Sequence, residues 1–166
     1  MGSRIEHRAL FSPDVEAVLA ATSTEDAIRA RLAEIGGEHA ELLSFTPSGD
    51  GVSFKLRQGI SADRLPQAVR VIHKGDLMVE RTQTWTRDGD GYTGTATAVV
   101  SGVPGEITAR TSLKREGDKT VLANIGEVVV RIPLLGSKLE GVIAEQVTKL
   151  LHREAEFTAK WLAENA

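Results

Sequence analysis

The sequence predicts an α+β protein in which a curved antiparallel sheet of about seven strands wraps around a long C-terminal helix. In the middle of the chain, apolar and polar residues alternate between turns rich in Gly and Asp, which is typical of an antiparallel meander. After Pro133 the apolar residues recur with the 3.6-residue period of a helix. A helix of that length needs a broad apolar surface to lie on, and the concave face of the sheet is the candidate surface.

Length and charge narrow the possible classes of protein. A chain of 166 residues corresponds to one domain, 1–166, and buries roughly 70% of its unfolded surface. The net charge is -3 and the pI is about 5.8. Lys and Arg are scattered among acidic residues, whereas nucleic-acid-binding proteins concentrate basic residues on one face. We therefore expect no nucleic-acid partner.

The chain contains no cysteine, which excludes disulfides, thiol nucleophiles and thiolate metal sites. The first residues lack the apolar segment of a secretory signal. No apolar run approaches the roughly 20 residues that a membrane-spanning helix needs. The sequence therefore predicts a cytoplasmic protein without a membrane span.

Two short helices are expected after the first strand. Residues 4–11 alternate as a half-buried strand, with one face formed by Ile5, His7, Ala9 and Phe11. Ser12 and Pro13 are expected to begin a first helix. Ser23 followed by Asp26 resembles the capping box of a second helix, and Gly36-Gly37 predicts its left-handed end. The apolar stripe of that second helix is Ala27, Ile28, Leu32 and Ile35.

Turn signals divide the remaining strands of the meander at residues 47–51, 87–91, 103–105 and 116–118. One segment, residues 61–75, interrupts the meander. Its apolar residues have helical spacing, so we expect a short amphipathic helix or lid there. These residues are Leu65, Ala68, Val69 and Ile72.

The strand that begins at Leu77 carries polar residues on its inward face. Alternation puts the following residues on that face: Leu77, Val79, Arg81, Gln83 and Trp85. A buried charge is costly without a partner. Glu127 on the last strand or Glu154 on the long helix would supply one for Arg81. The alternative is a twisted or bulged strand whose polar groups reach the rim.

The long helix is expected to cover about 28 residues. Its apolar stripe comprises Leu139, Val142, Ile143, Val147, Leu150, Phe157, Trp161 and Leu162. Glu154 interrupts this stripe between Leu150 and Phe157, which suggests that its carboxylate points inward. Glu145 and Lys149 are expected to pair on the solvent side.

This order of elements resembles the START or birch-allergen-like helix-grip superfamily, also called SRPBCC. More narrowly, the chain resembles an actinobacterial family of unknown function within that superfamily. The matching residues are Gly75-Asp76-Leu77, Thr82-Gln83-Thr84-Trp85, Ile132 to Gly141 and Phe157 to Glu164. The resemblance implies a hydrophobic cavity between sheet and helix. The superfamily contains lipid carriers, hormone receptors, polyketide cyclases and chaperone activators, so membership does not fix the function.

The residues themselves also favour a cavity. Aromatic residues make up 4% of the chain, so few bulky side chains are available to fill the space under the helix. The small residues expected on the inner faces are Gly94, Ala96, Ala98 and Ala109. Phe54, Trp85 and Tyr92 are candidate wall residues, and His7 is either a rim residue or a ligand contact. The alternative is a helix packed close to the sheet.

Several apparent motifs have ordinary structural explanations. Residues 89–94 match G-x-G-x-x-G but join two strands, so we expect a hairpin rather than a dinucleotide loop. Gly136-Ser137-Lys138 lacks the spacing of a phosphate-binding loop and is expected to cap the long helix. The four histidines lie on different predicted elements. We therefore expect no metal, no cofactor and no catalytic motif.

Three functions remain open. The leading hypothesis is a protein that binds or carries a small hydrophobic or amphipathic molecule, such as a fatty acid, lipid or polyketide-like compound. In it, Arg81 meets an anionic head group and Gln83 adds a hydrogen bond. The second is a cyclase- or hydrolase-type enzyme in which His7, Glu127 or Glu154 transfers a proton. The third is a protein-interaction module using residues 65–72, which a core without a cavity would favour.

Overall fold

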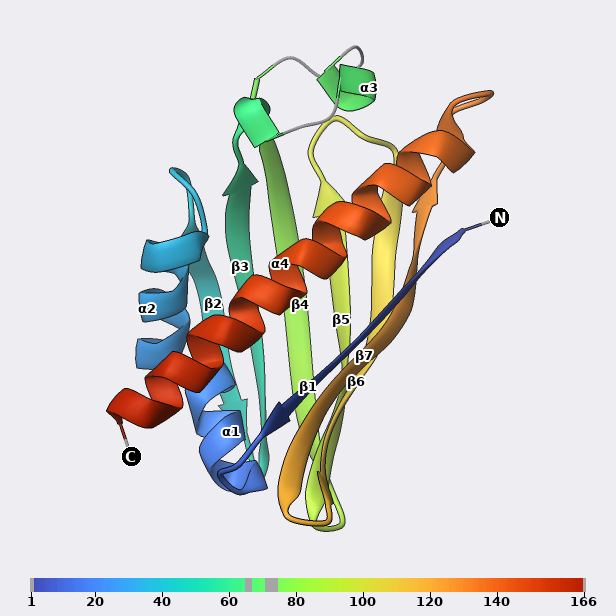
Figure 1. Ribbon diagram of the computed structural model, residues 1–166. Helices are drawn as coiled ribbons and strands as arrows, with labels where there is room; N and C mark the ends of the chain where they lie inside the picture. The colour runs from blue at the N-terminus through green and yellow to red at the C-terminus, as the bar shows by residue number, and fades with distance from the viewer. Residues whose placement is uncertain (1, 65–66, 71–74, 166) are drawn as a thin grey trace.

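The computed structural model describes residues 2–64, 67–70 and 75–165. Seven antiparallel strands form one sheet in the order β1-β7-β6-β5-β4-β3-β2. The strands are β1 (Ser3–Phe11), β2 (Glu41–Ser48), β3 (Gly51–Ile60), β4 (Leu77–Asp88), β5 (Gly91–Val100), β6 (Gly105–Glu116) and β7 (Lys119–Val130). The long helix α4 (Gly136–Glu164) runs diagonally across the concave face of the sheet (Figure 1). The predicted α+β helix-grip architecture is confirmed.

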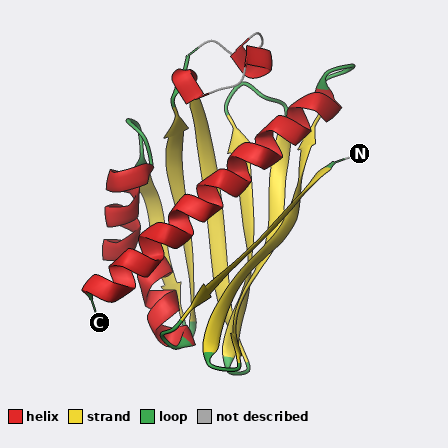
Figure 2. Cartoon of the chain, viewed as in Figure 1, coloured by secondary structure: helices red, strands yellow, loops and turns green. Residues whose placement is uncertain are grey.

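The two short helices lie after β1 as predicted, beside β2 and the C-terminal end of α4 (Figure 2). However, their capping residues differ from the expectation. The side chain of Asp14 accepts a hydrogen bond of 2.9 Å from the amide of Ala17 and caps α1 (Val15–Ser23). Thr24 caps α2 (Glu25–Ile35), since its hydroxyl accepts from the amide of Ala27 at 3.3 Å. The predicted caps Ser12 and Ser23 were therefore wrong by one or two residues.

Glycine at the predicted turns permits the backbone geometry that the hairpins require. Gly37 has φ +87° and ends α2 in the left-handed region, as expected. Gly89 has φ +62° between β4 and β5, which confirms a hairpin rather than a dinucleotide loop. The start of α4 differs from the expectation, because no side chain caps it. Instead Glu140, inside the helix, accepts a hydrogen bond of 2.8 Å from the amide of Val130.

Residues 61–75 contain two short helical segments, η1 (Ala62–Arg64) and α3 (Gln67–Arg70). Leu65 and Ile72, and the side chains of Ala68 and Val69, lie outside the described residues. The amphipathic lid therefore stays a prediction.

The interior contains two apolar clusters that meet beneath the middle of α4. One joins α1 and α2 to the sheet and includes Ile28, Phe54 and Trp85. The other lies under the N-terminal half of α4 and includes Ile5, Leu77 and Leu139. None of the helices in the described ranges has both the length and the apolar character needed to cross a bilayer.

Candidate functional site

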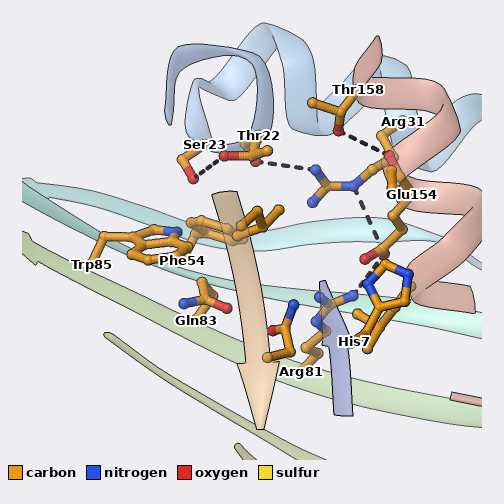
Figure 3. Close-up of a pocket in the computed structure, with 14 residues that line it drawn as sticks. His7, Thr22, Ser23, Arg31, Phe54, Arg81, Gln83, Trp85, Glu154 and Thr158 are labelled. Atoms are coloured by element: carbon orange, nitrogen blue, oxygen red, sulfur yellow. Dashed lines mark hydrogen bonds and ion pairs between the residues drawn. The ribbon is translucent and has the colours of Figure 1, made fainter. Parts of the chain in front are cut away.

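A buried polar centre lies where the two apolar clusters meet. We use this name for Arg31 of α2, Gln58 of β3, Arg81 of β4 and Glu154 of α4. Arg81 Nη1 donates a hydrogen bond of 2.7 Å to Glu154 Oε2, and Gln58 Nε2 donates to the same oxygen at 3.4 Å. Arg31 Nε lies 3.9 Å from that oxygen (Figure 3). Side chains from α2, β3 and β4 therefore converge on one carboxylate of α4.

Local structure places Arg81 and Glu154 opposite each other. On β4 the alternation turns Arg81 inward, as predicted, in line with the buried residues Leu77, Gln83 and Trp85. On α4, Glu154 is only 8% exposed because it occupies the apolar face between Leu151 and Phe157. The predicted inward orientation and pairing of Glu154 are confirmed. The other proposed partner, Glu127, is exposed on β7 and does not pair with Arg81.

Arg31 was not predicted from the sequence. Its side chain is 4% exposed, and Nη1 donates to the carbonyl oxygen of Thr22 at 3.1 Å. Arg31 follows Ala27 by four residues and Ile28 by three, so it lies on the buried face of α2. That spacing was the available signal, because a charged residue on a buried stripe requires a partner.

The charged groups of the polar centre shift one another's pKa values. Burial opposes ionisation of Glu154, but Arg81 and Arg31 together hold its pKa below the ordinary value. Burial also disfavours the charge on Arg81, yet the contact with Glu154 raises its pKa. For Arg31 burial outweighs the attraction of Glu154, and its pKa is lowered. Glu154 is therefore a carboxylate at neutral pH, and it compensates Arg81 better than Arg31.

Three neighbouring spaces lie around the centre. The inner cavity, about 50 Å³, is bordered by the charged members of the polar centre, Arg31, Arg81 and Glu154, and by Phe54 and Trp85. The apolar cavity, about 60 Å³, lies under α4 and shares Arg81, Asn124 and Leu151 with the inner cavity. Its small and aliphatic lining includes Ile5, Val79, Ala96, Ala98, Ala109 and Val147.

The outer groove, about 500 Å³, borders α2, β3, β4 and α4. It shares Gln58, Val79 and Leu150 with the apolar cavity. The outer groove alone falls within the roughly 300–1,000 Å³ of small-molecule sites. The inner and apolar cavities exceed the roughly 10–15 Å³ that one water requires. The three spaces are therefore neighbours, separated only by the side chains that they share.

The structure brings six of the seven candidate residues to the inner cavity, namely His7, Phe54, Arg81, Gln83, Trp85 and Glu154. Tyr92 is buried elsewhere, at the start of β5. Its hydroxyl donates to Glu16 and accepts from Arg87 at 2.8 Å. Gln83 Nε2 already donates to Thr111 Oγ1 at 3.0 Å and to the Thr84 carbonyl. That nitrogen is therefore occupied by the protein itself.

His7 borders the inner cavity from β1. Burial is the main cause of its lowered pKa, the proximity of His152 adds to the effect, and Glu154 opposes it. The ring centroids of His7 and His152 are 6.3 Å apart in an edge-on arrangement. His7 is consequently a neutral imidazole at pH 7, able to accept or donate a proton.

A cluster of potential metal ligands lies apart from the polar centre. Glu38, His39 and Asp76 place one ligand atom each within 4.8 Å of one another. Glu38 and His39 are exposed, and Asp76 Oδ1 accepts a hydrogen bond of 2.8 Å from the amide of Ala62. Exposed acidic groups often gather without an ion, so this cluster by itself does not assign a metal site.

Comparison with known sequences identifies the family. The model of DUF2505, described as a protein of unknown function, matches residues 6–162. An uncharacterized protein of Mycobacterium tuberculosis, Rv0481c, is 32% identical over 166 residues that cover 93% of this chain and 94% of the relative. The chain therefore belongs to the DUF2505 family, and the predicted assignment to an actinobacterial family is confirmed.

Solved structures show the same fold at low sequence identity. TTHA0849 of Thermus thermophilus superposes with a TM-score of 0.68 at 9% identity, covering 99% of each chain. Ara h 8.0201 gives 0.62 at 12% identity, also over 99% of each chain. Norcoclaurine synthase from Thalictrum flavum gives 0.59 at 13% identity, over 100% of this chain and 89% of that one. These similarities confirm the predicted birch-allergen-like, SRPBCC fold.

Proposed function

We propose that this DUF2505 protein binds or carries a small hydrophobic or amphipathic molecule between the sheet and α4. One observation carries the proposal: the apolar cavity adjoins an inner cavity with buried charges, and Arg81, Asn124 and Leu151 line both. Small-molecule sites typically combine mostly apolar walls with a few placed polar groups. An amphipathic ligand matches both compartments.

The energetics of the buried charges support a functional role. Burying an ion pair in place of well-packed apolar residues is often neutral or unfavourable for stability. Here Arg31 and Glu154 are buried and the Arg81 side chain is 17% exposed, and Gln58 Oε1 and Arg31 Nε are buried without a hydrogen-bond partner among the described residues. Buried polar atoms of that kind call for a partner. A ligand group in the inner cavity would supply one for Arg31, whereas Gln58 borders the neighbouring apolar cavity.

The sizes of the spaces define the expected pose. The inner and apolar cavities are each small, about 50 and 60 Å³. A longer ligand would extend past Gln58, Val79 and Leu150 into the outer groove, which is about 500 Å³. Norcoclaurine synthase, which shares the fold, has been solved with dopamine and hydroxybenzaldehyde bound. Both are small amphipathic molecules, which supports the ligand class without identifying the ligand.

Native mass spectrometry of freshly purified protein tests this function. We expect an extra mass of small-molecule size that disappears on denaturation, and organic extraction would then identify the compound. Titration with decanol and decanoate covers the case in which purification removes the ligand. A clean apo mass, combined with no uptake of either compound, would contradict the proposal.

A second candidate function is an enzyme that uses the same cavity, with His7 as the proton-transferring group. The supporting observation is a neutral imidazole that borders the inner cavity. Glu154 is a weaker candidate because its pKa is lowered, and Glu127 is exposed. Incubating the extracted compound with wild type, His7→Gln and His152→Gln separates the functions. Turnover lost only in His7→Gln supports the enzyme, and an unchanged compound in all three supports a carrier.

A protein-interaction module is less well supported, because that hypothesis expected a core without cavities.

The cysteine-free composition fits the proposed cytoplasmic location.

A further inference from the structure

Arg31 is a deeply buried guanidinium that has no anionic partner within hydrogen-bonding range among the described residues. Its guanidinium is almost fully buried, yet its one direct hydrogen bond is from Nη1 to the Thr22 carbonyl. Nε makes no hydrogen bond to any residue that the structure describes, and its distance of 3.9 Å to Glu154 Oε2 exceeds hydrogen-bonding range. A guanidinium has five N–H donors in a fixed fork. Its Nε–H donor is therefore available to a ligand.

The inner cavity also has an excess of positive charge. Among its described lining residues, two guanidinium groups face one carboxylate. Arg81 contacts Glu154 at 2.7 Å, whereas the contact between Arg31 and Glu154 is 3.9 Å. His7 is neutral and does not offset the imbalance. Because buried charge is costly unless paired, this cavity favours a ligand that brings one negative charge.

Figure 3 shows the side chains that would surround an anionic ligand group in the inner cavity. The Arg31 guanidinium spans the space between Thr22 and Glu154, and Arg81 lies below it on the sheet side. Phe54 and Trp85 form the adjoining aromatic wall. The side-chain hydroxyls of Thr22 and Ser23, which are hydrogen-bonded to each other at 3.1 Å, border the same cavity.

We propose that the ligand carries a single anionic group, such as a carboxylate, which binds Arg31 in the inner cavity while its apolar body lies in the apolar cavity. This inference rests on the proposed binding function and adds the ligand class to it. It also reassigns the principal anion contact. Arg81, the residue expected from the sequence, is neutralised by Glu154, and Arg31 is the guanidinium left without a short anionic partner. Guanidinium groups recognise carboxylates bidentately, which suits a fork with free donors.

The test compares decanoate with decanol, which have the same chain length and differ in charge at pH 7.5. Intrinsic tryptophan fluorescence reports binding of both compounds, because Trp85 lies in the cavity wall. Wild type is expected to bind decanoate more tightly by about tenfold or more, the preference that a hydrogen bond to a charged group provides. Equal affinities would overturn the anionic inference but leave the binding function intact. No binding of either compound would contradict both.

Variants locate the anion contact. Arg31→Gln is expected to remove the preference for decanoate while the affinity for decanol stays unchanged, and Arg31→Lys is expected to keep part of the preference. The matched control is Arg29→Gln on the same helix, where the exposed Arg29 pairs with Glu25 at 2.9 Å. A preference that survives in a folded Arg31→Gln variant, checked by circular dichroism, would overturn the assignment. If that variant does not fold, Arg31→Lys and the wild-type comparison decide the question.

Discussion

Arg81 in the centre of the sheet donates a hydrogen bond of 2.7 Å from Nη1 to Glu154 Oε2 in the C-terminal helix, across 73 positions of sequence. This contact joins α4 to β4 in a region where the surrounding side chains are mostly apolar. It also fixes the position of the carboxylate between two arginines. The polar centre therefore contributes both to stability and to the chemistry of the cavity, and substitutions can separate these contributions.

Removing the carboxylate should destabilise the fold strongly. Glu154→Gln leaves Arg81 and Arg31 buried without a counter-charge, and breaking a buried pair in this way costs about 3–5 kcal/mol. Urea denaturation measures the change in the free energy of unfolding. The control is Glu156→Gln, on the exposed face of the same helix near His152, where a change within about 0.5 kcal/mol is expected. Equal effects of the two variants would show that the centre contributes little to stability.

Stability should fall in acid partly because Glu154 must be protonated. Its pKa in the folded protein is below the ordinary value of 4.5. A depressed folded-state pKa contributes stability that is present above the unfolded-state value and is lost as pH falls through the folded-state value. Urea denaturation between about pH 3 and 6 should therefore show a smaller loss of stability below pH 4.5 for Glu154→Gln than for wild type. Parallel curves would contradict the predicted ionisation.

Filling the apolar cavity should weaken binding irrespective of ligand charge. Ala109 lines that cavity from β6, so Ala109→Leu would occupy the space of the ligand's apolar body. We expect a loss of affinity for both decanoate and decanol, measured by Trp85 fluorescence. Thr108→Leu is the matched control, since Thr108 is the neighbouring residue on the exposed face of the same strand. An unchanged affinity in Ala109→Leu would show that the ligand does not enter this cavity.

Gly94 should not tolerate a side chain. A Cβ atom there would lie 1.7 Å from the carbonyl oxygen of Thr84 on the neighbouring strand. Gly94→Ala is therefore expected to destabilise the protein by more than about 2 kcal/mol through backbone displacement. Gly141 in α4 has open space around its Cβ position, and Gly141→Ala should stabilise by roughly 0.4–1 kcal/mol. Thermal denaturation of both variants checks the contrast, and a tolerated Gly94→Ala would contradict the strand register.

Alternation and helical spacing predicted which side chains face inward. On β4 the period of two placed Arg81, Gln83 and Trp85 inside, and the interrupted stripe of α4 placed Glu154 inside. Both predictions hold because a one-residue slip would turn the buried face to solvent. The capping residues Asp14 and Thr24 were missed, since several nearby side chains could act as caps and the tertiary structure selects among them.

Periodicity predicts which face of a strand or helix a residue occupies. It does not predict whether that position along the element lies next to the cavity. Tyr92 faces the interior as predicted, yet it lies at the start of β5 and its hydroxyl donates a hydrogen bond to Glu16 instead of bordering the cavity. Arg31 was missed because only the apolar residues of its helix were taken as the buried stripe. Its role depends on packing between α2 and α4, elements more than 100 residues apart, which the sequence pattern does not contain.

A nuclear magnetic resonance titration with decanoate tests the central claim most directly, because it shows where the ligand binds. We predict chemical-shift changes at the methyl groups of Ala96, Ala98 and Ala109 and at the Nε–H group of Arg31. Shifts confined to exposed apolar residues, such as Leu134 and Leu135 before α4, would contradict a site between the sheet and the helix.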